Sequence, residues 1–163
     1  MRTSGFGVAY GAALGARWHE FTFAATYRRG DFSDWQLSTV CGELAMRFRL
    51  GAFVPHLGFG AGYAALTGAV ADVSRTLAPD PPTAIEISGL NVRVSVGLDY
   101  YLLGWLSLGA NLSGDAFFLR RHGDRLIRTS STDVSSPPAF PYGLDGSGNG
   151  LGATLSVLLG LHY

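Results

Sequence analysis

Apolar and polar residues alternate with a period of two along most of this chain. From Leu151 to Tyr163 the odd positions hold Leu, Ala, Leu, Val, Leu, Leu and Tyr, whereas the even positions are mostly small or polar. The same alternation fills 90–101, where Val92 and Val94 share one face and Asn91 and Arg93 share the other. A period of two is the signature of a β-strand, and no helix shares it.

This pattern predicts about seven strands in a single domain that covers residues 1–163. The predicted strands are 6–16, 19–27, 40–50, 55–65, 90–101, 106–118 and 151–163. Each is close to or above the ~9–11 residues that a tilted strand needs to cross a bilayer. One domain is what a chain of this length accommodates. We therefore predict an all-β protein, folded as an antiparallel up-and-down barrel.

The two faces of the strands indicate which solvent each one meets. One face is rich in Leu, Val, Phe and Tyr, and the other is mostly Gly, Ala, Ser and Thr. Small residues suit the crowded lumen of a narrow barrel, so the large apolar face would meet lipid. A soluble, lipocalin-like ligand-binding barrel is the alternative, but it would point its apolar face inward and carry many Lys, Glu and Asp outside.

The composition agrees with a transmembrane barrel. Hydrophobic residues make up 47% of the chain, charged residues only 15%, and every basic residue is Arg. No apolar run approaches the ~20 residues of a membrane helix. The net charge is zero, which argues against nucleic acid as a partner because phosphate binding requires a basic surface.

Aromatic residues fall near the ends of the predicted strands, where membrane barrels carry two aromatic girdles. Phe6, Tyr27, Trp35, Tyr63 and Phe118 are expected at one rim. The other rim is expected to carry His19, Phe48, Phe53, Tyr100, Trp105 and Tyr163.

The connections indicate orientation and strand number. They are short at 15–18, 50–54 and 102–105, and longer at 29–34, 66–86 and 120–150. Bacterial barrels place short turns in the periplasm and long loops outside, so the first and last predicted strands both descend. Because such barrels have an even number of strands, we expect an eight-stranded barrel whose first strand precedes residue 1. The alternative is an unrecognised strand within 120–150.

The final strand carries the most specific pattern, in Leu155, Val157, Leu159, Leu161 and Tyr163. It resembles the outer-membrane targeting signature of alternating apolar residues that ends in an aromatic residue, usually Phe. The rest of the chain resembles small OmpA/OmpX-like barrels of Gram-negative bacteria in pattern, without a diagnostic motif. The resemblance implies Sec export, recognition by the barrel-assembly machinery and a place in outer-membrane lipid within the cell envelope.

Six charged residues occur on the small-residue face and are expected inside the lumen. Buried charges must pair, because an isolated one is costly. We expect Glu20 to pair with Arg47 and Arg93 to pair with Asp115. The favoured interpretation is a structural polar core, and the alternative is a gate or an ion path. The expected lumen network is Glu20, Glu43, Arg47, Arg93, Asp99 and Asp115.

The sequence indicates no catalytic residue, cofactor or metal site. A lipid-modifying enzyme needs a His or carboxylate that activates a Ser or water, and neither His56 nor His162 is part of a His-X-Ser arrangement. The predicted role is structural or in surface interaction, with a possible extracellular partner at 66–86 and 120–150. A narrow transport barrel, a lipid-modifying enzyme and the soluble barrel are the alternatives.

Overall fold

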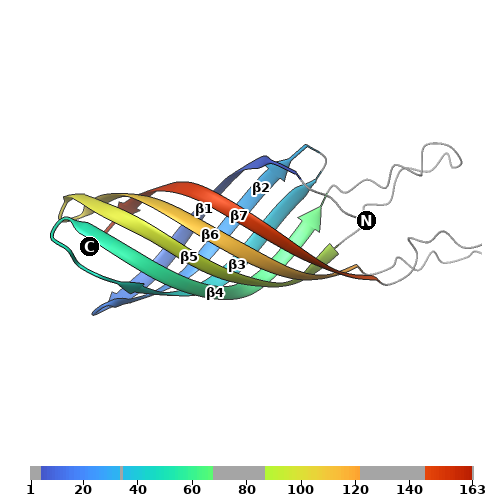
Figure 1. Cartoon of the computed structure of the whole chain (residues 1–163), viewed down its shortest axis with the longest axis horizontal. Coiled ribbons are helices and arrows are strands. Elements are labelled where there is room, and N and C mark those ends of the chain that lie inside the picture. The colour runs from blue at the N-terminus through green and yellow to red at the C-terminus, as the bar shows by residue number, and fades with distance from the viewer. Residues whose placement is uncertain (1–4, 34, 68–86, 122–145, 163) are drawn as a thin grey trace, which may run out of the picture.

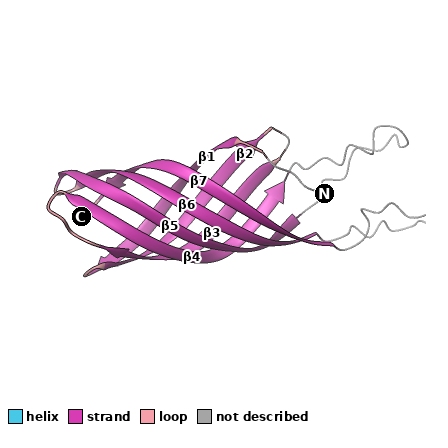
Figure 2. Ribbon diagram, in the orientation of Figure 1, coloured by secondary structure: helices cyan, strands magenta, loops and turns pink. Residues whose placement is uncertain are grey.

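The computed structural model describes residues 5–33, 35–67, 87–121 and 146–162, and nearly all of them lie in one antiparallel sheet. Figure 2 shows no helix in this part of the chain. The chain folds into seven up-and-down strands that curl into a half-barrel (Figure 1). The strands are β1 (Gly7–Trp18), β2 (Phe21–Phe32), β3 (Gln36–Arg47), β4 (Phe53–Thr67), β5 (Ile87–Leu103), β6 (Leu106–Arg121) and β7 (Gly146–Leu161).

Each strand pairs with its neighbours in sequence, in the order β1 to β7. The β1–β2, β3–β4 and β5–β6 connections lie at one end of the sheet, which we call the turn end. The β2–β3, β4–β5 and β6–β7 connections lie at the opposite end, which we call the loop end. In Figure 1 strand β7 ends at the turn end, and strand β1 begins at the loop end.

All seven predicted strands are present, but several bounds differ from those expected. The first turn consists of His19 and Glu20, not 15–18, and His19 takes a positive φ of 55° there. Strand β2 continues to Phe32, so most of the expected long connection at 29–34 is strand and only 33–35 links β2 to β3. Arg29 pairs across the sheet with Tyr10 and Ser38. Charged residues at both faces of β2 had hidden this extension.

Strand β7 begins earlier than expected because its first residues carry no apolar signal. Gly146 lies opposite Arg121 and Gly150 lies opposite Phe117, in continuous register with β6. The expected connection 120–150 therefore shortens to 122–145, and 66–86 shortens to 68–86. Both shortened segments, with any partner site in them, lie outside the described residues.

The alternating residues of each strand form two faces of the sheet that differ in polarity. Along β5 the side chain of Val94 is 56% exposed, whereas neighbouring Ser95 is 8% exposed. Among the described residues, eleven buried side chains are polar or charged, and only Cys41, Val54, Ala64 and Phe117 are buried and apolar. The sheet therefore encloses its polar face and exposes its apolar one.

Glycines on the inner face make room for the polar side chains of adjacent strands. Gly60 lies directly between Glu43 and Arg93 in the register of β3, β4 and β5. A Cβ atom at Gly60 would meet the Cγ atom of Glu43 at 2.8 Å. Gly42 faces the other way, and a Cβ there would meet nothing within 4 Å.

These two glycines give a matched test of the inner face. Gly60→Ala should lower the free energy of unfolding by about 1–3 kcal/mol, because the added methyl group overpacks the lumen beside Glu43. Gly42→Ala should leave stability unchanged or slightly raised, since it adds a methyl group in open space and removes backbone freedom from the unfolded chain. Denaturant titration in detergent micelles measures both. Equal losses would contradict the assignment of the two faces.

Candidate functional site: two polar clusters of the lumen

The first group of inner polar residues surrounds Arg93, whose side chain is almost completely buried at 3% exposure. Its Nε donates to Oδ1 of Asp115 at 2.7 Å, and its Nη1 donates to Oε1 of Glu43 at 2.8 Å. Nη2 donates to Oγ1 of Thr39 at 3.3 Å. The guanidinium thus contacts two carboxylates on opposite sides, β6 and β3, and the two negative charges are shared by one cation.

Further donors complete this group. Oγ1 of Thr26 donates to the same Glu43 oxygen at 2.9 Å, and Nδ2 of Asn91 donates to Oδ1 of Asp115 at 3.1 Å. Charge-assisted hydrogen bonds of this kind are shorter and stronger than neutral ones. We name the group the Arg93 cluster; it consists of Thr26, Thr39, Glu43, Asn91, Arg93 and Asp115.

The second group lies nearer the turn end, around Asp99. Nη1 of Arg47 lies 2.8 Å from Oδ2 of Asp99, and Nδ1 of His56 lies 3.5 Å from the same oxygen. The ring of His56 fits above Gly97, where a Cβ atom would approach it to 2.5 Å. We name Arg47, His56 and Asp99 the Asp99 cluster.

The structure brings together most of the residues expected in the lumen, with one correction. Arg93 and Asp115 pair as expected, and Glu43 joins them. The expected pair of Glu20 and Arg47 is wrong: Glu20 lies exposed in the β1–β2 turn, and Arg47 pairs with Asp99. The turn lies two residues further along than expected, which takes Glu20 out of the strand. Only the backbone carbonyl of Glu20 meets Arg47, accepting from its N–H at 2.7 Å.

Two basic residues of the inner face, Arg28 and His56, were not predicted as members of the lumen network. Arg28 on β2 reaches across the lumen and donates from Nη1 to Oγ of Ser113 on β6 at 2.8 Å. His56 was considered only as a catalytic candidate, yet it belongs to the Asp99 cluster. The signal that could have found both is their strand parity, since each occupies the small-residue face.

Ser107 and His162 form the one arrangement that resembles a catalytic pair. The Oγ atom of Ser107 lies 2.8 Å from Nε2 of His162, and the ring of Tyr101 packs 4.9 Å from the His162 ring. Burial and the nearby charge of Arg47 lower the pKa of His162, so the ring is neutral at neutral pH. Ser107 is only 3% exposed, and its contact with His162 joins the chain after β7 to the start of β6.

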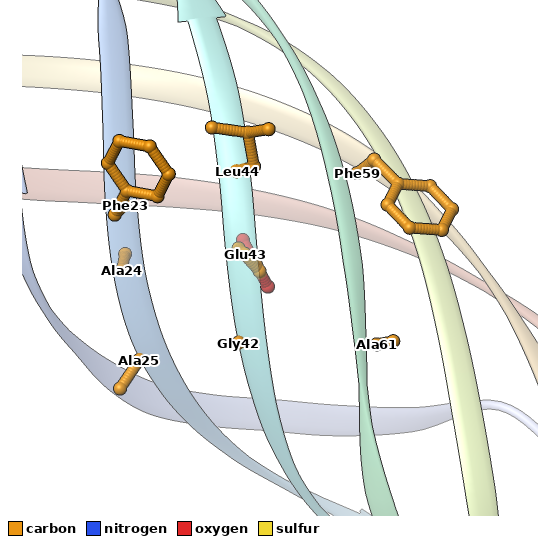
Figure 3. Close-up of a pocket in the computed structure, with 8 residues that line it drawn as sticks. All are labelled: Phe23, Ala24, Ala25, Gly42, Glu43, Leu44, Phe59 and Ala61. Carbon is orange, nitrogen blue, oxygen red and sulfur yellow. The ribbon is translucent and has the colours of Figure 1, made fainter.

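The outer face has a shallow hollow across β2, β3 and β4, drawn in Figure 3. Ala25, Gly42 and Ala61 are consecutive partners across the three strands and form its floor. The rings of Phe23 and Phe59 flank it (Figure 3). Apolar groups make up most of its lining, and Glu43 of β3 is the charged residue among those that line it.

The expected rim residues within the described ranges are exposed, except for Trp35; Tyr163 lies outside these ranges. Trp35 is half-buried and stacks on Phe32 with ring centroids 3.7 Å apart. Phe53 and Tyr100 pack against each other at the turn end, with centroids 4.9 Å apart. The exposed members are Phe6, His19, Tyr27, Phe48, Phe53, Tyr63, Tyr100, Trp105 and Phe118.

The expected targeting strand corresponds to the outer face of β7. The side chains of Leu155 and Val157 are each 78% exposed, and Leu159 and Leu161 are also exposed. The final residue of the pattern, Tyr163, lies outside the described residues.

Within the described ranges, no group of three or more His, Cys, Asp or Glu residues is placed to hold a metal ion. The described residues include no helix long and apolar enough to cross a membrane. The chain matches no protein-family model, no curated protein and no solved structure.

The Arg93 cluster allows a direct test of charge pairing. Arg93→Leu leaves Glu43 and Asp115 buried without their shared cation, so it should lower the free energy of unfolding by about 3–5 kcal/mol. Denaturant titration in detergent micelles measures the loss.

Arg29→Leu is the matched control, because Arg29 is partly exposed near the loop end, where it pairs with Asp31 at 3.5 Å and donates to Gln36 at 2.5 Å. Exposed pairs contribute little, since water already solvates both charges, so this variant should unfold almost as the parent does. A comparable loss in both variants would show that the Arg93 cluster is not the buried core of the sheet.

Proposed function

We propose that this protein is a small transmembrane β-barrel of the bacterial outer membrane, with a lumen filled by side chains. The observation that carries the proposal is the reversed distribution of polarity across the sheet. The inner face holds Arg93 and its two carboxylates, whereas the outer face exposes Leu together with Val or aromatic side chains along every strand from β3 to β7. Only a hydrocarbon solvent makes such an outer face favourable.

The alternative of a soluble, lipocalin-like barrel requires the opposite arrangement. Such a barrel holds its ligand in an apolar interior and turns its polar residues to water. Here Val94 and Val96 face outward. Ser95, which lies between them, and Asp99, three residues after Val96, both face inward. The described part of the inner face is therefore lined mainly by polar side chains, which favours the membrane proposal over a ligand-binding interior.

The filled lumen favours a structural or surface-interaction role over transport. Arg93 contacts β2, β3 and β6 from its place on β5, so its guanidinium spans the curled sheet. Arg28 crosses the same space from β2 to β6. Narrow barrels are just wide enough for side chains to fill. Partners would then be outer-membrane lipid, the barrel-assembly machinery and an extracellular partner bound by the long connections.

The lipid-modifying alternative would have to use the Ser107–His162 pair. That pair lies on the inner face at the turn end, away from the lipid-facing side chains. A lipid substrate would need access to Ser107, whose side chain is buried. We therefore propose no enzymatic activity.

Cysteine labelling tests which face meets lipid, in a Cys41→Ser background that removes the native thiol. Val94→Cys and Val157→Cys should react with a lipid-phase thiol probe in protein folded into lipid vesicles, because both positions are on the exposed apolar face. Ser95→Cys and Ser156→Cys, their neighbours on the inner face, are the matched controls and should not react with that probe. Protection of positions 94 and 157 in folded protein would overturn the proposal.

A further inference from the structure

The outer face of the sheet carries rows of side chains that cross all seven strands. Residues opposite each other in paired strands share a face, so each row can be followed through the six ladders. One row near the loop end is mainly apolar and holds three aromatic rings, and we call it the aromatic row. It consists of Ala12, Tyr27, Val40, Tyr63, Leu90, Phe118 and Asn149.

The next outward row toward the loop end is polar. It holds two arginines and three serines, and we call it the arginine row. It consists of Tyr10, Arg29, Ser38, Ala65, Ser88, Arg120 and Ser147. At the turn end the outward residues of the described strands remain apolar or aromatic, as at Trp18, Phe53 and Leu159. Within these strands, therefore, only the loop end presents cations on the outer face.

The two arginines of the arginine row differ in their partners. Arg29 lies 3.5 Å from Asp31 and donates to Gln36 at 2.5 Å, so a carboxylate already balances its charge. Arg120 is exposed and lies one residue before the end of β6, at the loop end (Figure 1). The carboxylates of the described β5, β6 and β7 are Asp99 and Asp115, and both are buried on the inner face. Arg120 is thus a cation without a counter-charge on this part of the outer face.

The residues beside Arg120 suit a phosphate group. A guanidinium binds phosphate through two parallel N–H···O bonds. Ser88 on β5 and Ser147 on β7 lie opposite Arg120 in the two ladders. Their hydroxyl groups can donate to further phosphate oxygens, and their side chains are too short to cover the guanidinium. Three adjacent strands therefore supply donors to one position on the outer face.

The apolar side chains next to this position indicate a lipid as the source of the phosphate. Leu90 and Phe118 follow Ser88 and Arg120 by two residues toward the turn end, and they are 50% and 49% exposed. A ligand that contacts both the arginine row and the aromatic row needs an anionic head and an apolar body. A lipid with an anionic phosphate headgroup has both, whereas a free phosphate ion has no apolar part.

We propose that Arg120, between Ser88 and Ser147, binds the phosphate of an anionic lipid headgroup at the loop end of the sheet. The acyl chains of that lipid then lie against Leu90 and Phe118. This inference rests on the proposed function, because the outer face meets lipid only if the sheet spans a membrane.

Native mass spectrometry of the full chain, released from an uncharged detergent, provides the test. The probe is dioleoyl phosphatidate, with dioleoyl phosphatidylcholine as the lipid without net charge and inorganic phosphate as the free anion. The parent protein should bind phosphatidate more tightly than phosphatidylcholine. Inorganic phosphate at the same concentration should not displace it, since the free ion makes no apolar contact.

Substitutions locate the site. Arg120→Gln should weaken phosphatidate binding about fivefold, the effect of one basic residue at a charged membrane surface. Arg120→Lys should recover only part of the loss, because an ammonium group keeps the charge but lacks the planar fork. Replacing Ser88 and Ser147 together by Ala should cause a smaller loss than Arg120→Gln.

Arg29→Gln is the matched control. It makes the same change of charge in the same row, at a residue that Asp31 already neutralises. At an ionic strength of ~0.15 M, where screening acts over about 8 Å, it should change phosphatidate binding less than twofold. Affinity for phosphatidylcholine should be the same in all variants.

Equal phosphatidate binding by the parent and Arg120→Gln, or an equal loss in Arg29→Gln, would overturn the inference. Displacement by inorganic phosphate would overturn the lipid as the source of the anion. Folding into phosphatidylcholine vesicles separates this inference from the proposed function. A parent that enters these vesicles but shows no preference for phosphatidate leaves the proposed function intact, whereas a parent that does not enter them overturns both.

Discussion

The buried guanidinium of Arg93 constrains much of the sheet around it. A cation with 3% side-chain exposure must have its donors satisfied and its charge balanced, and here two carboxylates from different strands do both. Glu43, Gly60, Arg93 and Asp115 occupy one continuous row across β3 to β6. A slip of one residue in any of these ladders would move a charged member to the outer face. The Arg93 cluster thus specifies the register of these ladders. The apolar outer face alone would specify that register less strongly.

The same cluster explains the pattern of small residues inside the sheet. Arg93 can reach Glu43 only over a strand that carries no side chain at the crossing point, and Gly60 is at that point. Asp99 leans over Gly109, where a Cβ atom would meet its carboxylate oxygen. Arg93, His56 and Asp99 each have a glycine beside them, so at these places one strand supplies a large inner side chain and its neighbour supplies none.

Local pattern was enough to predict the faces, the strand order and the pair of Arg93 and Asp115. That pair lies within one hairpin with a tight turn, so counting back from the turn places the two residues opposite each other. Ion pairs between side chains on second-neighbour strands could not be predicted in this way. Glu43 meets Arg93, and Arg47 meets Asp99, across β4 in both cases, because curling brings second-neighbour strands within reach of long side chains. The wrong pairing of Glu20 has a different cause, a turn displaced by two residues. The start of β7 was missed because Gly146, Gly148 and Gly150 have no side chains to alternate.

The polarity of the two faces limits the solvents in which this fold is favourable. In water the outer face would expose a nearly continuous apolar surface, which drives association. In hydrocarbon the outer face is solvated, and the charges are withdrawn to the inner face, where Arg93 and Arg47 meet carboxylates. The backbone adds a further condition, because lipid also requires every edge N–H and C=O to be paired. The distribution of side chains therefore favours the proposed membrane setting. The backbone suits that setting as well, provided that the edges of β1 and β7 are paired.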